Sequence, residues 1–463
     1  MILVLITLVV YYQPISRTFN LQPIILILAS FIFYAVNRPV LLLLLLSSIA
    51  INILVSYKIA ASPDKYRKWI TGLGVAANLS LLAFFKYSPL IGKTFFTPSD
   101  SIGEFLLTIP LPIGVSFFTF ISITLLVDTF RETDGRGKGK LVASTMSGHI
   151  VNATLMISFF PQILAGPIVK AREFIPQIQP KRMETIDIEY CFKTLLLGYF
   201  FKMVLADNLK DLTFWIAFPY FQAQSGITLL FLLFGYSLQL FADFAGYSLI
   251  AIGVAALFGY KLPQNFNYPY ISKSFSEFWT RWHMSLSGFL KEYLYFPLGG
   301  NRKGNKRTYL NLMIVMVLGG FWHGAAWSYA VWGAFHGLLL VVERYLRQRF
   351  TLPDHPLIKA LQIIVVFSLV TFAWLLFKLP DFRQAIDFIK AIFKNLGLPP
   401  NSHLMLHITL YALPLIFYHL FYLVRSRVSH TTVSRLDPIL YGTLFFLILT
   451  NSGSPTDFIY FQF

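Results

Sequence analysis

The chain has little charge, one cysteine and no low-complexity tract, and each shortage excludes a class of protein. Asp, Glu, Lys and Arg make up 13% of the 463 residues, about half the share of a soluble globular chain. So few charged side chains could not cover a soluble surface of this size. With Cys191 alone the chain forms no internal disulfide and no CxxC site. The composition therefore excludes a disulfide-rich secreted fold, disorder and collagen.

Apolar residues are abundant instead, at 56% of the chain, with a mean hydropathy of +0.63. An apolar segment of ~20 residues spans a bilayer. We therefore predict an all-α, polytopic integral membrane protein with about ten to thirteen membrane helices, forming a single domain over residues 1–463. The apolar segments lie at 1–12, 21–36, 39–58, 69–85, 105–128, 150–168, 194–217, 226–259, 309–343, 357–377, 403–424 and 438–450.

The formal net charge of +17 is explained by basic loops on the cytoplasmic side, where they contact anionic lipid. No basic segment is long or lies on a separate polar domain, so we expect membrane lipids and no nucleic acid as partners. The basic clusters are 58–68, 131–140, 170–182, 302–307, 344–349 and 425–435. Counting crossings from these clusters places the tail, residues 451–463, outside the cytoplasm.

Between residues 262 and 308 the pattern changes. Pro263, Asn265, Asn267 and Pro269 interrupt any helix, and residues 275–298 then mix charged side chains with aromatic ones. This predicts re-entrant or interfacial helices that line a water-accessible cavity. No internal repeat is visible, which disfavours a transporter built from two similar halves.

The segment 309–343 must cross and return, and Gly319 and Gly320 are the predicted bend. His323 follows directly inside an apolar segment, where ionisable groups tend to face a cavity or a partner. A neutral imidazole there could take a proton from a hydroxyl nucleophile, or it could simply bond across helices. His336 lies 13 positions further on, so we expect no metal pair with His323 and a structural role.

Two further groups could bind a substrate. His283 lies in the re-entrant region, with Asp243 and Glu277 as candidate partners, and either binds an acyl donor or anchors the fold. Arg302 and Lys303 follow a glycine pair in a basic loop, which suits phosphates but equally suits a cytoplasmic anchor. His403 and His407 share a helix face but lack the glutamate of a zinc protease, so we expect no metal site.

Six sequence stretches resemble the membrane-bound O-acyltransferase family, in particular its bacterial branch that contains the alginate O-acetyltransferase membrane subunit. They cover residues 110–340 in order and are FWTRWH (278–283), YLYFPLGGNR (293–302), FWHG (321–324), PIGVSF (112–117), PQILAGPIV (161–169) and DFAGYS (243–248). The resemblance implies a ring of tilted helices around a central cavity. It also implies that His323 is catalytic and that His283 lies in the site.

The tail, DFIYFQF (457–463), resembles the aromatic-tyrosine end found in this branch and in the small partner of the teichoic-acid D-alanyl transferase. There the tyrosine is thought to take the acyl group. The resemblance therefore implies that Tyr460 is a transient acyl acceptor, because a phenol leaves more readily than an alkyl alcohol. The alternative is an interfacial aromatic anchor.

Together these expectations describe a bacterial cytoplasmic-membrane enzyme with an extracytoplasmic C-terminus. It would move an acetyl group from a cytoplasmic thioester, either acetyl-coenzyme A or an acyl carrier protein, with no bound cofactor. His323 would be the general base, Tyr460 the acceptor, and His283, Arg281, Trp282, Asp243, Arg302 and Lys303 would bind the donor. A periplasmic esterase-like partner would then acetylate an exported polysaccharide. The alternatives are direct acylation of a lipid or small alcohol, and a secondary transporter.

Overall fold

The computed structural model describes residues 2–36, 39–97, 100–133, 135, 141–379, 381–424, 430–455 and 458, except for the side chains of 430–434. Within these ranges the regular structure is helical and contains no strand, which confirms the predicted all-α class. The chain divides into two compact units, Met1–Leu195 with Ile250–Pro263, and Leu196–Leu249 with Gln264–Phe463. The single domain over 1–463 stays a prediction.

Five helices in the described part of the chain are long and apolar enough to cross a membrane by themselves. They are α4 (Pro39–Ala61), α5 (Asp64–Phe95), α12 (Gly226–Leu257), α17 (Pro356–Lys378) and α19 (Ser402–Val424). Other apolar segments divide into shorter or more polar helices. The number of ten to thirteen crossings therefore stays a prediction.

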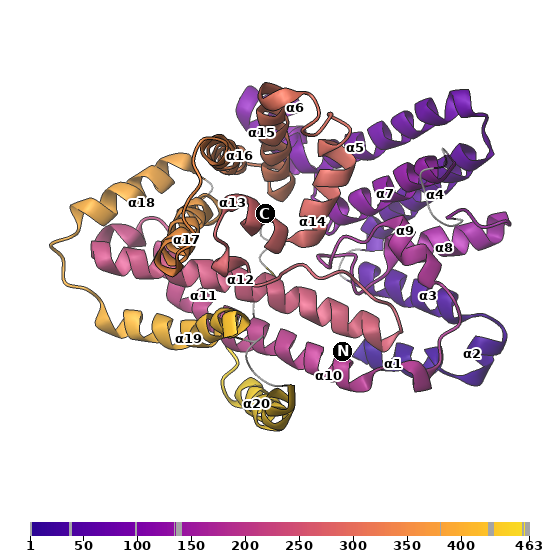
Figure 1. Cartoon of the computed structure of the whole chain (residues 1–463). Helices are drawn as coiled ribbons and strands as arrows, with labels where there is room; N and C mark the ends of the chain where they lie inside the picture. Colours follow the sequence, from indigo (N-terminus) through magenta and orange to yellow (C-terminus); the bar gives the residue numbers. More distant parts are fainter. Residues whose placement is uncertain are drawn as a thin grey trace. The chain divides into compact units, whose positions relative to one another are not determined.

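The first unit is a bundle in which α4, α5, α7 and α8 pack on one another (Figure 1). Besides α4 and α5, its elements are α1 (Ile2–Tyr11), α2 (Pro14–Thr18), α3 (Gln22–Ala35), α6 (Ser101–Thr108), α7 (Val115–Thr133), α8 (Met146–Ser158), α9 (Ala171–Phe174), the 3-10 helices η1 (Ile175–Gln177) and η2 (Met183–Thr185), and most of α10 (Ile188–Tyr199).

Buried polar side chains join the helices of this unit. Asn52 on α4 exchanges amide hydrogen bonds with Asn78 on α5, at 3.1 and 2.8 Å. Ser56, one turn further along α4, lies 2.8 Å from the Nε2 atom of His149 on α8. Between membrane helices such pairs stabilise association, because lipid offers no competing hydrogen bonds. His149 is thereby part of the scaffold.

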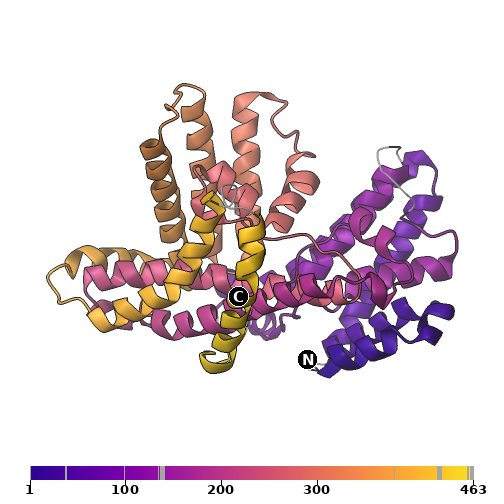
Figure 2. The same cartoon turned by 60° about the horizontal axis from the view of Figure 1, so that its bottom comes forward.

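The second unit carries the remaining helices. They are the π-helix η3 (Phe200–Ala206), α11 (Asp207–Thr213), η4 (Phe214–Ile216), η5 (Tyr220–Ala223), η6 (Pro269–Ile271), α13 (Phe275–Arg281), α14 (Met284–Phe289), the π-helix η7 (Leu290–Tyr295), α15 (Gly304–His323), α16 (Trp327–Arg347), α18 (Phe382–Lys394) and α20 (His430–Thr450), with α17, α19 and the part of α12 up to Leu249. Helix α20, yellow in Figure 2, packs against η3.

The segment 309–343 forms two helices, α15 followed by α16, and its crossing of the membrane stays a prediction. The predicted bend at Gly319 and Gly320 is wrong. Helix α15 continues through both glycines to His323, and the turn follows it at Gly324. Gly320 serves close packing instead, since a Cβ atom there would lie 2.2 Å from the carbonyl oxygen of Tyr329 on α16. The missing side chains let the two backbones meet, as in other membrane helix pairs.

The predicted interruption between residues 262 and 308 is confirmed. The chain there forms only short elements, η6, α13, α14 and η7. Two residues, Tyr268 and His283, have left-handed backbone with φ of 48° and 43°. Left-handed backbone at a non-glycine residue is uncommon and persists where the surroundings enforce it.

Candidate functional site

A cavity of about 880 Å³ lies in the second unit, among α13, α14, η7, α15 and α16. One of its walls is a single face of α15. Leu312, Val315, Met316, Gly319 and His323 line it, at the spacing that places residues on one side of a helix. From Leu312 to His323 this face extends over ~16 Å of helix rise. The cavity is therefore a long channel with His323 at one end.

The other end of the channel is charged. Glu343, Arg344 and Arg347 of α16 line it. Lys291 of η7 lines the cavity further in, beside Leu290, whose side chain lies against Gly319 of α15. The charged end lies near the start of α15, where Asn305 bonds Gln348 at 3.2 Å. Since α15 and α16 run in opposite directions, the basic end and His323 are separated by most of the helix length. The basic loop predicted to face the cytoplasm thus lies at the mouth of the channel.

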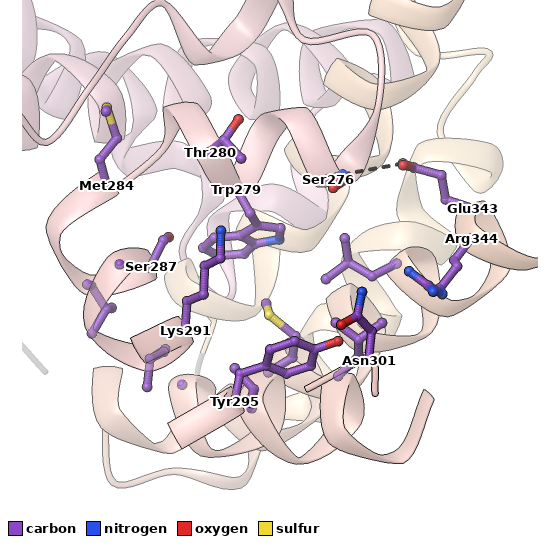
Figure 3. Close-up of a pocket in the computed structure, with 18 of the residues that line it drawn as sticks. Ser276, Trp279, Thr280, Met284, Ser287, Lys291, Tyr295, Asn301, Glu343 and Arg344 are labelled. Atoms are coloured by element: carbon purple, nitrogen blue, oxygen red, sulfur yellow. Dashed lines mark hydrogen bonds between the residues drawn. The ribbon is translucent and has the colours of Figure 1, made fainter. Parts of the chain in front are cut away.

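Glu343 fixes the geometry of this mouth. Its carboxylate accepts hydrogen bonds from the backbone N–H groups of Phe275, at 2.5 Å, and Ser276, at 3.4 Å (Figure 3). It also pairs with Arg347 at 3.4 Å. The carboxylate therefore ties α16 to the first turn of α13. Arg344 is different, because its Nε atom is buried without a hydrogen-bond partner among the described residues.

Polar groups that suit a ligand line the channel. Figure 3 shows Tyr295 and Asn301 pointing toward the side where Arg344 lies. Burial raises the pKa of the Tyr295 phenol, while Arg344 acts in the opposite direction, so the hydroxyl stays a donor at neutral pH. Trp279 and Trp332 also line the channel, and their indole N–H groups are buried without hydrogen-bond partners in the described chain. Buried donors of this kind need an acceptor, which a bound ligand can supply.

His323 is only 4% exposed and lies in an aromatic enclosure at the inner end of the channel. Its ring centroid is 5.2 Å from those of Trp332 and Phe377. The histidine is the last residue of α15, so the helix holds its backbone while the side chain faces the channel. A buried imidazole at the end of a ligand-sized channel can exchange a proton with a bound ligand.

His283 lies behind this wall. Its ring centroid is 6.3 Å from that of His323, yet it does not line the channel. Of the candidate partners, Asp243 pairs with Lys202 and Glu277 pairs with Arg281. The Nδ1 atom of His283 instead lies 3.2 Å from the Oδ1 atom of Asn265.

Asn265 also determines which nitrogen of His283 carries the proton. Its amide nitrogen donates to the hydroxyl of Ser248 at 3.0 Å, so its Oδ1 atom is the acceptor. His283 therefore carries its proton on Nδ1, and Nε2 is its acceptor nitrogen. The bond also holds the left-handed backbone of His283.

The structure separates the other residues predicted to bind the donor. Arg281 pairs with Glu277 at 2.9 Å and donates to the carbonyl of Asn267 at 3.0 Å, so it braces the loop. Trp282 is buried in the core. Asp243 pairs with Lys202 at 2.8 Å, and Asp207 pairs with the same lysine at 2.7 Å.

Arg302 and Lys303 are exposed and do not line the channel, whereas their neighbour Asn301 does. Sequence reasoning assigned Arg344 and Arg347 only to the topology. Their spacing could have indicated that they line a site together, because Leu340, Glu343, Arg344 and Arg347 recur at helical intervals and share one face of α16. That face lines the channel.

The C-terminal tail reaches the same region. Phe458 is 3% exposed, stacks on Tyr247 with ring centroids 4.4 Å apart, and lies 5.7 Å from Phe244. The ring of Phe244 is 4.6 Å from His283. Ring contacts therefore run from the tail to the two histidines. Tyr460 lies outside the described residues.

In the described part of the chain, His, Cys, Asp and Glu side chains form no cluster that could hold a metal ion. His403 and His407 lie with ring centroids 4.3 Å apart on α19, and Nδ1 of His407 bonds the carbonyl oxygen of His403 at 2.8 Å. This local bond uses one ring nitrogen within the helix.

Known proteins resemble the chain over most of its length. The model of the membrane-bound O-acyltransferase family matches residues 142–380. A peptidoglycan O-acetyltransferase of Helicobacter pylori is 36% identical over 429 residues, 84% of this chain and 80% of that protein. A protein of Pseudomonas aeruginosa named as a probable alginate O-acetylase is 35% identical over 83% of this chain and 71% of its own length. A teichoic acid D-alanyltransferase of Streptococcus thermophilus is 30% identical over 70% of this chain and 78% of that protein.

Proposed function

Because the chain belongs to the membrane-bound O-acyltransferase family and is thus a membrane acyltransferase, we propose that it moves acetyl groups from a cytoplasmic thioester to an exported polysaccharide. The observation that carries the proposal is the channel, which joins a basic mouth to His323. A channel of this form suits a donor with an anionic head and a long, narrow arm that ends in a thioester.

Coenzyme A and acyl carrier proteins share such an arm, since both present a thioester on phosphopantetheine. Arg344 at the mouth would bind the phosphate. The arm carries two amides, whose carbonyl oxygens would accept from the indole N–H groups of Trp279 and Trp332. The thioester would then lie beside His323. The donor site is thus built from α16, η7 and α13, with Arg302 and Lys303 in a supporting loop.

At the inner end His323 would act as general base. The hydroxyl oxygen of the acceptor bonds to the thioester carbonyl carbon as its proton passes to the imidazole. The carbon–sulfur bond then breaks, and the imidazolium protonates the departing thiolate. The products are a thiol and an oxygen ester. His283, held by Asn265, would position His323 or the acceptor from behind the wall.

We further propose that the first acceptor is Tyr460, from which an esterase-like extracytoplasmic partner takes the acetyl group. Phe458, two positions earlier, is buried against Tyr247 and Phe244 on the way to the histidines, which supports a tail directed into the site. A tyrosine ester passes its acetyl group on more readily than an alkyl ester. The C-terminus would then enter from the extracytoplasmic side, opposite the donor.

The names of the relatives favour a polymer as final acceptor. They refer to peptidoglycan, alginate and teichoic acid. Direct acylation of a lipid or small alcohol remains the alternative within the family. The transporter alternative is set aside, because the family and its relatives are acyltransferases.

Arg344→Gln tests the donor site. In proteoliposomes supplied with radiolabelled acetyl-coenzyme A, we expect the KM for the donor to rise about tenfold, the usual effect of losing one charge-assisted bond. Arg349→Gln is the matched control, because Arg349 lies over the ring of Tyr345 at 4.2 Å and does not line the channel. Equal KM values for the two variants would refute the donor site.

Tyr460→Phe tests the relay. If the residue is only an interfacial anchor, the change is silent, since the ring remains and only the hydroxyl is lost. If it carries the acetyl group, transfer to the partner stops while the protein stays folded. Mass spectrometry of the C-terminal peptide, with donor present and partner deleted, should find an added acetyl mass in the wild type. An active Tyr460→Phe variant would exclude the relay.

A further inference from the structure

We propose that Asn451 and Gly453 are positioning residues that seat the C-terminal tail on the π-helix η3. The inference rests on the proposed function in one respect, that the tail must reach the site of transfer.

Three hydrogen bonds hold the tail just after α20 ends. The backbone N–H of Gly453 donates to the carbonyl oxygen of Met203 at 2.9 Å. The side-chain amide of Asn208 donates to the carbonyl oxygen of Asn451 at 3.0 Å. The hydroxyl of Tyr411 on α19 donates to the side-chain oxygen of Asn451 at 3.2 Å. The tail is therefore bonded to η3, α11 and α19 within three residues.

The seat requires glycine at position 453. A Cβ atom there would lie 2.7 Å from the backbone nitrogen of Asn208 and 2.8 Å from the carbonyl carbon of Asp207. Both atoms belong to the backbone, so neither can move aside as a flexible side chain would. Any larger residue must push the tail away from η3. Position 442 on α20 does not require glycine in this way, because nothing lies within 4 Å of a Cβ atom on Gly442.

The π-helix explains why the seat lies here. A π-helix shifts the hydrogen-bonding register of the backbone, and such turns occur frequently at functional sites. In η3 the carbonyl of Met203 accepts from the tail. Lys202 in η3 pairs with Asp207 at its end and with Asp243 on α12, at 2.7 and 2.8 Å. This buried cluster holds η3 in shape.

Phe458 provides the second point of attachment. The five residues from Gly453 to Phe458 can span at most ~17 Å when extended. With Gly453 seated on η3 and Phe458 stacked on Tyr247, the direction of the tail is set toward Phe244 and His283. Gly453 and Phe458 are thus two fixed points of the tail.

Gly453→Ala tests the seat, with Gly442→Ala as the matched control. We expect hydrogen exchange in the peptide that follows α20 to become about tenfold faster in Gly453→Ala, as for a locally opened segment. The donor KM and the thermal midpoint should stay as in the wild type, while kcat for transfer to the extracytoplasmic acceptor falls. Gly442→Ala should change none of these. Unchanged exchange in Gly453→Ala would overturn the proposal.

Asn451 gives an independent test with a conservative rescue. Asn451→Leu removes the acceptor for Tyr411 and should accelerate exchange of the same peptide, whereas Asn451→Asp keeps an acceptor oxygen and should restore protection. The exchange measurements test the seat independently of the proposed role of Tyr460 as acyl acceptor. Should Gly453→Ala loosen the tail while Tyr460→Phe stays active, the seat stands and the relay fails. If the leucine and aspartate variants exchange alike, the seat at Asn451 is refuted.

Discussion

Among single residues, His323 and His336 have contrasting surroundings although both are buried histidines. His323 faces the channel. His336 lies among rings, 4.7 Å from Trp332 and 5.1 Å from Trp279, and neither of its nitrogens has a hydrogen-bond partner among the described residues. Only the first can reach a ligand in the channel, so their contributions to catalysis should differ.

His323→Gln should lower acyl transfer by roughly a hundredfold to ten-thousandfold, the range lost with a general base, because an amide cannot take the proton. His336→Gln is the matched change and should keep most activity. Donor turnover in proteoliposomes measures both, and size-exclusion profiles check folding. Near-normal turnover of His323→Gln would exclude His323 as the general base.

Sequence alone could predict His323, because an ionisable residue in an apolar segment stands out. It could not predict Arg344 and Arg347 as channel residues, since a basic cluster that sets topology has the same composition as one that binds an anion. The left-handed backbone at His283 could not be predicted from the sequence either, because it depends on Asn265, 18 positions away in the chain.

Among the helices, the pair α15 and α16 shows why the sequence alone cannot tell a bend at Gly319 and Gly320 from a close helix contact. Glycine in a helix can mark a bend or a close contact, and the sequence pattern is the same for both. Gly320, Gly333 and Gly337 all belong to the contact, since Cβ atoms on them would lie 2.2 Å from Tyr329, 2.3 Å from Met316 and 2.8 Å from Met313. The turn itself needed no glycine inside the helix.

Gly320→Ala should therefore separate the two helices and lower stability by roughly 1–3 kcal/mol, as overpacking does. Gly72→Ala on α5 is the control, because nothing lies within 4 Å of its Cβ position. There alanine should stabilise the helix by about 0.5–1 kcal/mol. Thermal unfolding in detergent measures both changes. A Gly320→Ala midpoint at or above the wild type would contradict the packing argument.

For the whole molecule, the helical membrane class followed from composition, and the order of the apolar segments followed from hydropathy. The π-helices η3 and η7 did not, because a one-residue change in hydrogen-bond register leaves no trace in apolar spacing. Yet η7 supplies Lys291 and Tyr295 to the channel, and η3 contacts the tail at Gly453. The least regular helices thus carry much of the candidate site.

The charge distribution also predicts the topology. Single cysteines at Asn305 and Ser454, in a Cys191→Ser background, should react with an impermeant thiol reagent from opposite sides of the membrane. Asn305 lies in the basic cluster that is predicted to face the cytoplasm, and Ser454 follows α20 in the tail that is predicted to lie outside. Labelling of both positions from the same side would exclude the crossing scheme.

The basic mouth of the channel has one more consequence, in the response to ionic strength. Arg344 and Arg347 outnumber Glu343 there, so the mouth attracts anions before they bind. Salt shortens the reach of that attraction to ~10 Å at 0.1 M. Added salt should thus slow capture of a multiply charged donor such as acetyl-coenzyme A, while a neutral pantetheine thioester would enter at a rate that salt leaves unchanged.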